Sequence, residues 1–186
     1  MQAGRALALL WCVAARVVRC LRLMFARLGS LPVTDPMERY LTSDHINLQM
    51  QVRRFAEEAI APVARELDET AEFPWENTKR MAEMGLLGVP IPKEFGGLGL
   101  DYLSYALVVE ELAKFDASHS ITVSAHTTLG TSPILAFGTE EQKRRFLPPL
   151  ASGEVLGGFG LTEPGAGSDS GGTRTRAVRE GSNYRI

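Results

Sequence analysis

The sequence predicts an α+β chain in which helices occupy most of the 186 residues and strands appear only near the carboxyl end. Apolar residues recur at three- and four-residue steps up to about residue 150, which is typical of amphipathic helices. From Val155 onward, Gly-rich turns separate short β-branched stretches, which favour strands. With 45% hydrophobic residues, the chain is long enough to bury one core.

Charge and composition set the first 36 residues apart. They hold five arginines and one acidic residue, a net charge of +4, whereas the following 150 residues carry −6. The arginines interrupt every window long enough to span a bilayer, so stable membrane insertion is not expected. Residues 1–28 are rich in arginine and contain no acidic residue, so they resemble a mitochondrial presequence. The favoured alternative is an upstream choice of start, with the natural chain opening at Met37.

The first predicted helix begins at Thr42-Ser-Asp44, whose side chains suit an N-cap, and extends to about Thr70. Pro62 is expected to kink or divide it. A second helix is predicted from Pro74 to Gly85, because proline favours a first turn and glycine favours a helix end.

A Gly- and Pro-rich loop is predicted over residues 88–99, and Asp101 then caps a helix that extends through Leu112. Another helix is expected from about Ser118 to Phe137. Gly138-Thr139 combines a helix stop with a new cap, which predicts a short helix reaching Pro148. Strands are expected from Val155 to Leu161 and over residues 173–178.

The most informative stretch is Phe159-Gly-Leu-Thr-Glu-Pro-Gly-Ala-Gly-Ser-Asp169. Glycines allow consecutive backbone N–H groups to converge on one point, and such a nest suits a phosphate or the polar edge of a heterocycle. For Pro-Gly-x-Gly alone, a hairpin turn is the simpler interpretation. A Rossmann site is excluded, because position 170 is serine and the next segment is strand-like.

Other classes of site find little support. Cys12 and Cys20 both lie in the leader, which leaves the remainder of the chain without a disulfide framework or a cysteine metal site. The three histidines show no ligand spacing, so no metal site is predicted. A mildly acidic body without a basic stripe gives no support to nucleic-acid binding.

Residues 159–169 closely resemble the flavin-binding signature of acyl-CoA dehydrogenases. Five further stretches resemble the same family in the same order, and together the resemblance covers residues 37–186. Residues 37–45 resemble the opening of a bacterial member, which favours a cytoplasmic protein; a presequence would instead place it in the mitochondrial matrix. The five stretches are 48–57, 85–99, 110–113, 138–143 and 146–150.

The resemblance implies an N-terminal helical domain, a middle β-domain and a C-terminal helical domain. In this chain, the leader at 1–36 is followed by the N-terminal all-α domain at 37–152. Residues 153–186 form the beginning of the middle β-domain. The chain is expected to be truncated before a C-terminal helical domain. The family uses FAD, forms homotetramers, and passes electrons to an electron-transfer flavoprotein. Its glutamate base takes the α-proton of an acyl-CoA while the β-hydrogen leaves as hydride, giving the trans-2-enoyl-CoA.

Residue by residue, the resemblance assigns FAD contacts within 159–168, and Ser168 would also contact the acyl-CoA substrate. For Phe159 and Leu161 alone, strand packing is an equal alternative. No catalytic residue is assigned: Glu163 matches a structural part of the signature, the family's base lies beyond residue 186, and His126 is explained equally well as helix interior. The cofactor-binding set is Phe159, Gly160, Leu161, Thr162, Gly165, Gly167 and Ser168.

The leading functional prediction is therefore the front part of an acyl-CoA dehydrogenase for a short or branched acyl chain, inactive by itself. An acyl-CoA oxidase-like protein is an alternative prediction, because such relatives share the same fold and flavin. A non-catalytic helical interaction module is a third interpretation. The intact Thr162, Gly165, Gly167 and Ser168 argue against it, because a scaffold has no use for flavin-binding glycines.

Overall fold

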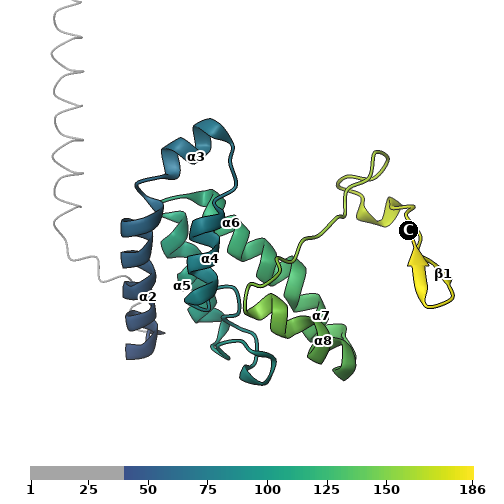
Figure 1. Ribbon diagram of the computed structural model, residues 1–186, viewed down its shortest axis with the longest axis horizontal. Coiled ribbons are helices and arrows are strands. Elements are labelled where there is room, and N and C mark those ends of the chain that lie inside the picture. The colour runs from purple at the N-terminus through teal and green to yellow at the C-terminus, as the bar shows by residue number, and fades with distance from the viewer. Residues whose placement is uncertain (1–39) are drawn as a thin grey trace, which may run out of the picture. The chain divides into compact units, whose positions relative to one another are not determined.

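The computed structural model describes residues 40–186, of which Ser43–Ile186 form one compact unit. The unit is mostly helical, with one short two-stranded sheet near the carboxyl end (Figure 1). The predictions for the leader, including Cys12, Cys20 and the start at Met37, lie outside the described residues. The α+β class and the helical character up to about residue 150 are confirmed.

The first predicted helix is present as three consecutive pieces: α2 (Ser43–Phe55), a π-helical turn η2 (Ala56–Ile60) and α3 (Ala64–Thr70). The π-turn is closed by the Ala61 N–H, which donates to the Ala56 carbonyl at 2.9 Å. Pro62 lies in the break before α3, because its ring carries no N–H for a continuous ladder.

The next elements begin and end where their local signals predict. Helix α4 (Trp75–Glu83) is followed by Gly85, whose φ of +75° is a left-handed conformation that glycine adopts without strain. After the 3₁₀ turn η3 (Lys93–Phe95), α5 (Tyr102–Ala113) begins with the Asp101 carboxylate accepting the Ser104 N–H at 2.8 Å.

The predicted helix over 118–137 is present as α6 (Ala117–Ala125), the π-helical η4 (His126–Thr131) and α7 (Ser132–Phe137). Helix α8 (Glu140–Ala151) starts at Thr139, which forms a complete capping box with Gln142.

The predicted end of α8 at Pro148 was wrong, because the helix continues through both prolines to Ala151. Each proline removes one N–H, and the carbonyls that lose a partner belong to Arg144 and Arg145, one turn earlier. Both arginines are exposed, so water can satisfy those carbonyls and the helix tolerates the prolines.

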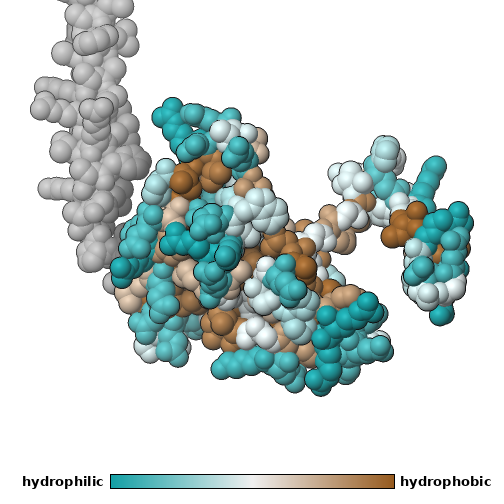
Figure 2. Space-filling view, in the orientation of Figure 1, coloured by the Kyte–Doolittle hydropathy of each residue, from teal (hydrophilic) through white to brown (hydrophobic). Residues whose placement is uncertain are grey.

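The main core lies among α2, η2, α4, α5, α6 and the loop at residues 86–89. A second, smaller cluster joins α8 to η3. The face shown in Figure 2 is largely hydrophilic over these helices, with apolar patches between them. The largest fully buried apolar side chains are Ile60, Met81, Leu86, Leu87, Ile91, Leu112 and Leu147.

The strand predictions were largely wrong. The only strands of the described part are β1 (Val178–Glu180) and β2 (Asn183–Arg185), an antiparallel pair with Val178 opposite Arg185. Residues 155–161 and 173–177 are extended or irregular and belong to no sheet. A strand exists only through a ladder of hydrogen bonds to a neighbouring strand, and within residues 40–186 neither stretch has such a neighbour.

Candidate functional site

The segment predicted to contact flavin, residues 159–168, follows α8 and a short connection. All seven predicted cofactor residues are exposed. Phe159 and Leu161 are 57% and 45% exposed, so the alternative in which they pack within a strand is not realised in this structure. The segment therefore presents both apolar and polar groups to its surroundings.

A tight turn at Glu163–Ala166 organises this segment. The Glu163 N–H donates to the Ala166 carbonyl and the Ala166 N–H donates to the Glu163 carbonyl, both at 3.1 Å, with Pro164 and Gly165 at the corner. This is the hairpin-type turn that the sequence left open. The same turn leaves neighbouring backbone donors available for other partners.

The two signature glycines are not required by the turn itself. Neither Gly165 nor Gly167 has a positive φ, and a Cβ built on either residue meets nothing within 4 Å. The backbone conformation seen here is therefore open to other residues at both positions. A requirement for glycine here has to come from a bound partner that approaches the backbone.

Unpaired donors and acceptors gather around this turn. Among the described residues, the N–H groups of Gly165, Gly167 and Ser168 find no hydrogen-bond partner, and neither do the hydroxyls of Thr162 and Ser168. Such groups, in the same segment as the exposed Phe159, fit a planar heterocycle with a polar edge. The residues present therefore fit the isoalloxazine ring of FAD.

Glu163 has a structural role in this arrangement. Its two carboxylate oxygens accept the backbone N–H groups of Arg174 and Thr175, each at 2.8 Å. Hydrogen bonds from Thr175 and Arg174 hold the pKa of Glu163 below its ordinary value. The carboxylate joins the turn to the segment that follows, and a lowered pKa makes it a weak base.

His126 contacts the chain two residues before this segment and is almost fully buried. Its Nδ1 accepts the Gly157 N–H at 2.9 Å, and its Nε2 lies 3.1 Å from the Leu150 carbonyl oxygen. Burial lowers the pKa of His126, so the ring is neutral at neutral pH. The sequence analysis assigned no role to this histidine.

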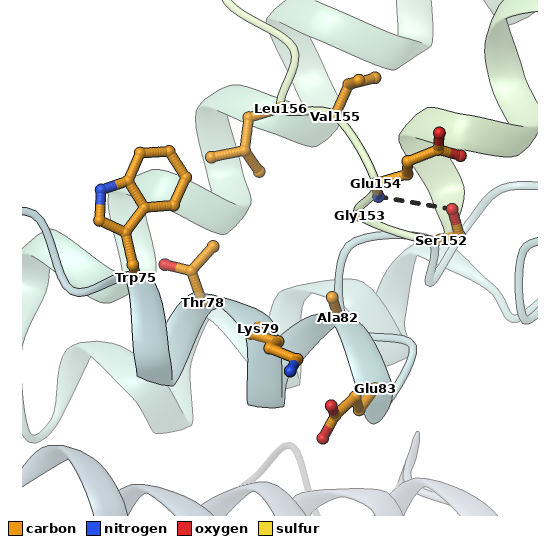
Figure 3. A pocket seen from close by; sticks show the side chains of 10 residues that line it. All are labelled: Trp75, Thr78, Lys79, Ala82, Glu83, Ser152, Gly153, Glu154, Val155 and Leu156. Carbon is orange, nitrogen blue, oxygen red and sulfur yellow. Dashed lines mark hydrogen bonds between the residues drawn. The ribbon is translucent and has the colours of Figure 1, made fainter.

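A pocket of about 660 Å³ lies between α4 and the connection at Ser152–Leu156 (Figure 3). Trp75 and Leu156 contribute apolar walls, and Lys79 and Glu83 contribute opposite charges from the same helix. None of the seven predicted cofactor residues lines it. It is therefore separate from the candidate flavin segment.

The sequence analysis also missed a buried carboxylate. Glu111 on α5 is fully buried and accepts hydrogen bonds from Gln49 at 2.8 Å and from Arg53 at 2.8 and 2.9 Å, both on α2, and from Lys114 at 2.8 Å. Burial alone would raise the pKa of Glu111, but these donors outweigh burial and lower it to about 2. The spacing of Gln49 and Arg53, one helical turn apart, is the signal that could have predicted a shared partner.

Residues 40–186 also bear on metal binding and on membrane insertion. No group of three or more potential ligand side chains could hold a metal ion there. None of the helices in that range is long and apolar enough to cross a membrane.

Comparison with protein families identifies most of this chain. Residues 42–154 match the acyl-CoA dehydrogenase N-terminal domain. A probable acyl-CoA dehydrogenase of Bacillus subtilis is 51% identical over 146 residues, covering 78% of this chain and 38% of the relative. A short-chain-specific acyl-CoA dehydrogenase of Clostridium acetobutylicum is 49% identical over 150 residues, 81% of this chain and 40% of the relative. The chain thus spans about two fifths of the length of these relatives.

Solved structures of the same family are also similar to this chain. Butyryl-CoA dehydrogenase of Megasphaera elsdenii has a TM-score of 0.72 at 41% identity, covering 76% of this chain and 38% of that one. A chain in a structure described for the electron transferring flavoprotein of Acidaminococcus fermentans has a TM-score of 0.75 at 44% identity, with 77% and 38% covered. The Bacillus anthracis acyl-CoA dehydrogenase in complex with FAD has a TM-score of 0.67 at 38% identity, with 74% and 24% covered. The match over residues 42–154 and the similarity to these relatives thus place this chain in the acyl-CoA dehydrogenase family.

Proposed function

We propose that this chain forms the helical and flavin-contacting part of an enzyme that converts an acyl-CoA thioester to the trans-2-enoyl-CoA. Family membership over residues 42–154 supports the reaction class. One observation on the chain itself carries the proposal: a single exposed segment holds backbone donors without a partner in the described chain, at Gly165, Gly167 and Ser168, together with an exposed aromatic ring and two such hydroxyls. These groups are exposed, so water satisfies them in the free chain and they are available to a ligand that replaces that water.

Bound FAD would supply the hydride acceptor. The chain's own residues would orient it: the Thr162 hydroxyl and the backbone N–H groups after Pro164 would donate to its polar edge. Phe159 and Leu161 would cover apolar ring surface and exclude water, which strengthens those hydrogen bonds. The Ser168 hydroxyl would be directed toward the acyl-CoA.

Three carboxylates of the described residues do not suit the role of general base. Glu111, Asp116 and Glu163 all have lowered pKa values and are committed to donors within the chain. A base that removes an α-proton at neutral pH works best with a pKa near 7. We therefore expect no acyl-CoA-dependent dye reduction by the 186-residue chain, even with added FAD. Measurable turnover would contradict this assignment.

The proposal extends to substrate, partners and location. A short acyl chain is supported by relatives named short-chain specific and butyryl-CoA dehydrogenase. An electron-transfer flavoprotein as electron acceptor is supported by the structure described for such a protein. We further propose a homotetrameric assembly and, from the bacterial relatives, a cytoplasmic location.

Amide NMR of the chain during titration with FAD tests the proposed site. We expect shifts at residues 159–168, and a larger loss of affinity for Gly167→Val than for Thr162→Val. Thr162→Val removes one neutral hydrogen bond, worth about 0.5–1.5 kcal/mol. Gly167→Val places atoms where the flavin would approach, although nothing in the free chain opposes them.

Gly158→Val is the matched control, because a Cβ at Gly158 also meets nothing within 4 Å and Gly158 lies outside the predicted set. It should bind FAD as the wild type does. If Gly167→Val bound FAD normally while Thr162→Val abolished binding, the backbone would not be the binding element.

A further inference from the structure

We propose that His126 is a positioning residue that fixes how the chain leaves the helical domain and enters the candidate flavin segment. This inference rests on the proposed function of residues 159–168. Gly157 is only two residues before Phe159, and its N–H donates to His126 Nδ1 at 2.9 Å. The histidine is 1% exposed, so the bond is shielded from competing water.

The two contacts of the ring demand one protonation state. Gly157 is a donor, so Nδ1 must be unprotonated; the Leu150 carbonyl is an acceptor, so Nε2 must carry the proton. A neutral ring with its proton on Nε2 satisfies both. The ring thereby joins the last turn of α8 to the first residue of the outgoing segment.

A second contact holds the same residue from another direction. Gly130 lies four residues after His126, one helical turn further along η4. A Cβ built on Gly130 would lie 2.7 Å from the Gly157 Cα, and a Cβ built on Gly157 would lie 2.8 Å from the Gly130 Cα. The two backbones are therefore packed directly together, without space for a side chain on either residue.

Together these contacts fix both the distance and the direction of Gly157. The hydrogen bond orients its peptide plane, and the glycine pair sets how closely it approaches η4. An extended chain advances about 3.3 Å per residue, so Phe159 begins about 7 Å beyond this clamp. A small change of angle at Gly157 is therefore enlarged along the segment that would contact flavin.

Two amide variants separate the two bonds of the ring. In His126→Asn, the side-chain oxygen lies near the Nδ1 position and can still accept the Gly157 N–H, whereas the donor to Leu150 is lost. In His126→Gln, the amide nitrogen reaches the Nε2 position and can still donate to Leu150, whereas the acceptor for Gly157 is lost. Each variant thus loses one buried hydrogen bond, and only one loses the bond proposed to position the segment.

The first readout is hydrogen exchange of the Gly157 amide in the 186-residue chain, followed by FAD titration. We expect His126→Gln to accelerate Gly157 exchange about tenfold and to weaken FAD binding, and His126→Asn to preserve both. Equal effects of the two variants, or an FAD affinity that follows thermal stability instead of Gly157 exchange, would overturn the proposal.

Failure of the proposed function gives a different pattern. If FAD does not bind the wild type but His126→Gln still accelerates Gly157 exchange, the clamp stands and the flavin site does not.

A second pair of variants avoids the helix interior should the histidine variants not fold. Gly157→Ala should shift the amide signals of residues 159–168, because its Cβ meets the Gly130 backbone. Gly158→Ala should leave them in place, because its Cβ meets nothing within 4 Å. Identical spectra for the two variants would contradict the clamp.

Discussion

The helical body and the segment after Gly157 differ in whether their polar groups have hydrogen-bond partners within the chain. In the body, Glu111 is fully buried and receives hydrogen bonds from three side chains. Asp116 and His119 pair with each other, and Asn77 contacts the far side of that imidazole at 3.2 Å. In the segment, several backbone donors have no partner among the described residues.

This difference separates the polar groups whose presence folding explains from those whose presence it does not explain. The buried network is complete within the chain, so its residues are accounted for by folding. Two buried hydroxyls, those of Thr78 and Thr127, are the exceptions among the described side chains. The donors around Gly165–Ser168 are exposed and have no partner in the described part of the chain, so they are free to bind the ligand that we propose.

The largest expected effect comes from breaking the buried network. Glu111→Ala leaves Arg53 and Lys114 without their shared carboxylate and should lower the free energy of unfolding by about 3 kcal/mol. The neighbouring Glu110→Ala is the matched control, because Glu110 also pairs with Lys114, at 2.9 Å, but its side chain is 57% exposed. The control should lose about 0.5 kcal/mol or less in urea unfolding. Equal losses would show that burial of Glu111 adds nothing.

Acid should remove the contribution that the ionised Glu111 carboxylate makes to the free energy of unfolding. The pKa of Glu111 is lowered from 4.5 to about 2 in the folded chain, so its contribution is complete above about pH 4.5 and is lost as pH falls toward 2. The wild type should therefore lose about 3 kcal/mol more than Glu111→Gln across that range, at about 1.4 kcal/mol per pKa unit. Parallel pH profiles from urea unfolding would contradict the network.

Part of this comparison was predictable from sequence. The caps at Asp101 and Thr139 and the stop at Gly85 depend on contacts within a few residues, and all three are confirmed. Glu111 was missed because its partners on α2 lie about sixty residues away in sequence. The strands over 155–161 and 173–177 were overpredicted because apolar and alternating patterns predict that a face is buried, whereas a strand also needs a neighbouring strand.

A smaller and more local effect is expected at Glu163. Glu163→Gln places an amide NH₂ opposite a backbone N–H, so the amides of Arg174 and Thr175 should exchange faster while global stability stays the same. Glu180→Gln is the control, since among the described residues that carboxylate forms an ion pair only with the exposed Arg185. Unchanged exchange at both amides would mean that Glu163 does not join the turn to the following segment.

Hydrogen exchange of the wild-type chain with and without FAD tests the central claim most directly. Without FAD, the amides of Gly165, Gly167 and Ser168 should exchange at unprotected rates while the amides of α5 are strongly protected. With saturating FAD, those three amides should become protected and α5 should not change. Protection of the three amides without FAD, or no gain of protection with it, would contradict the assignment of this segment to the flavin.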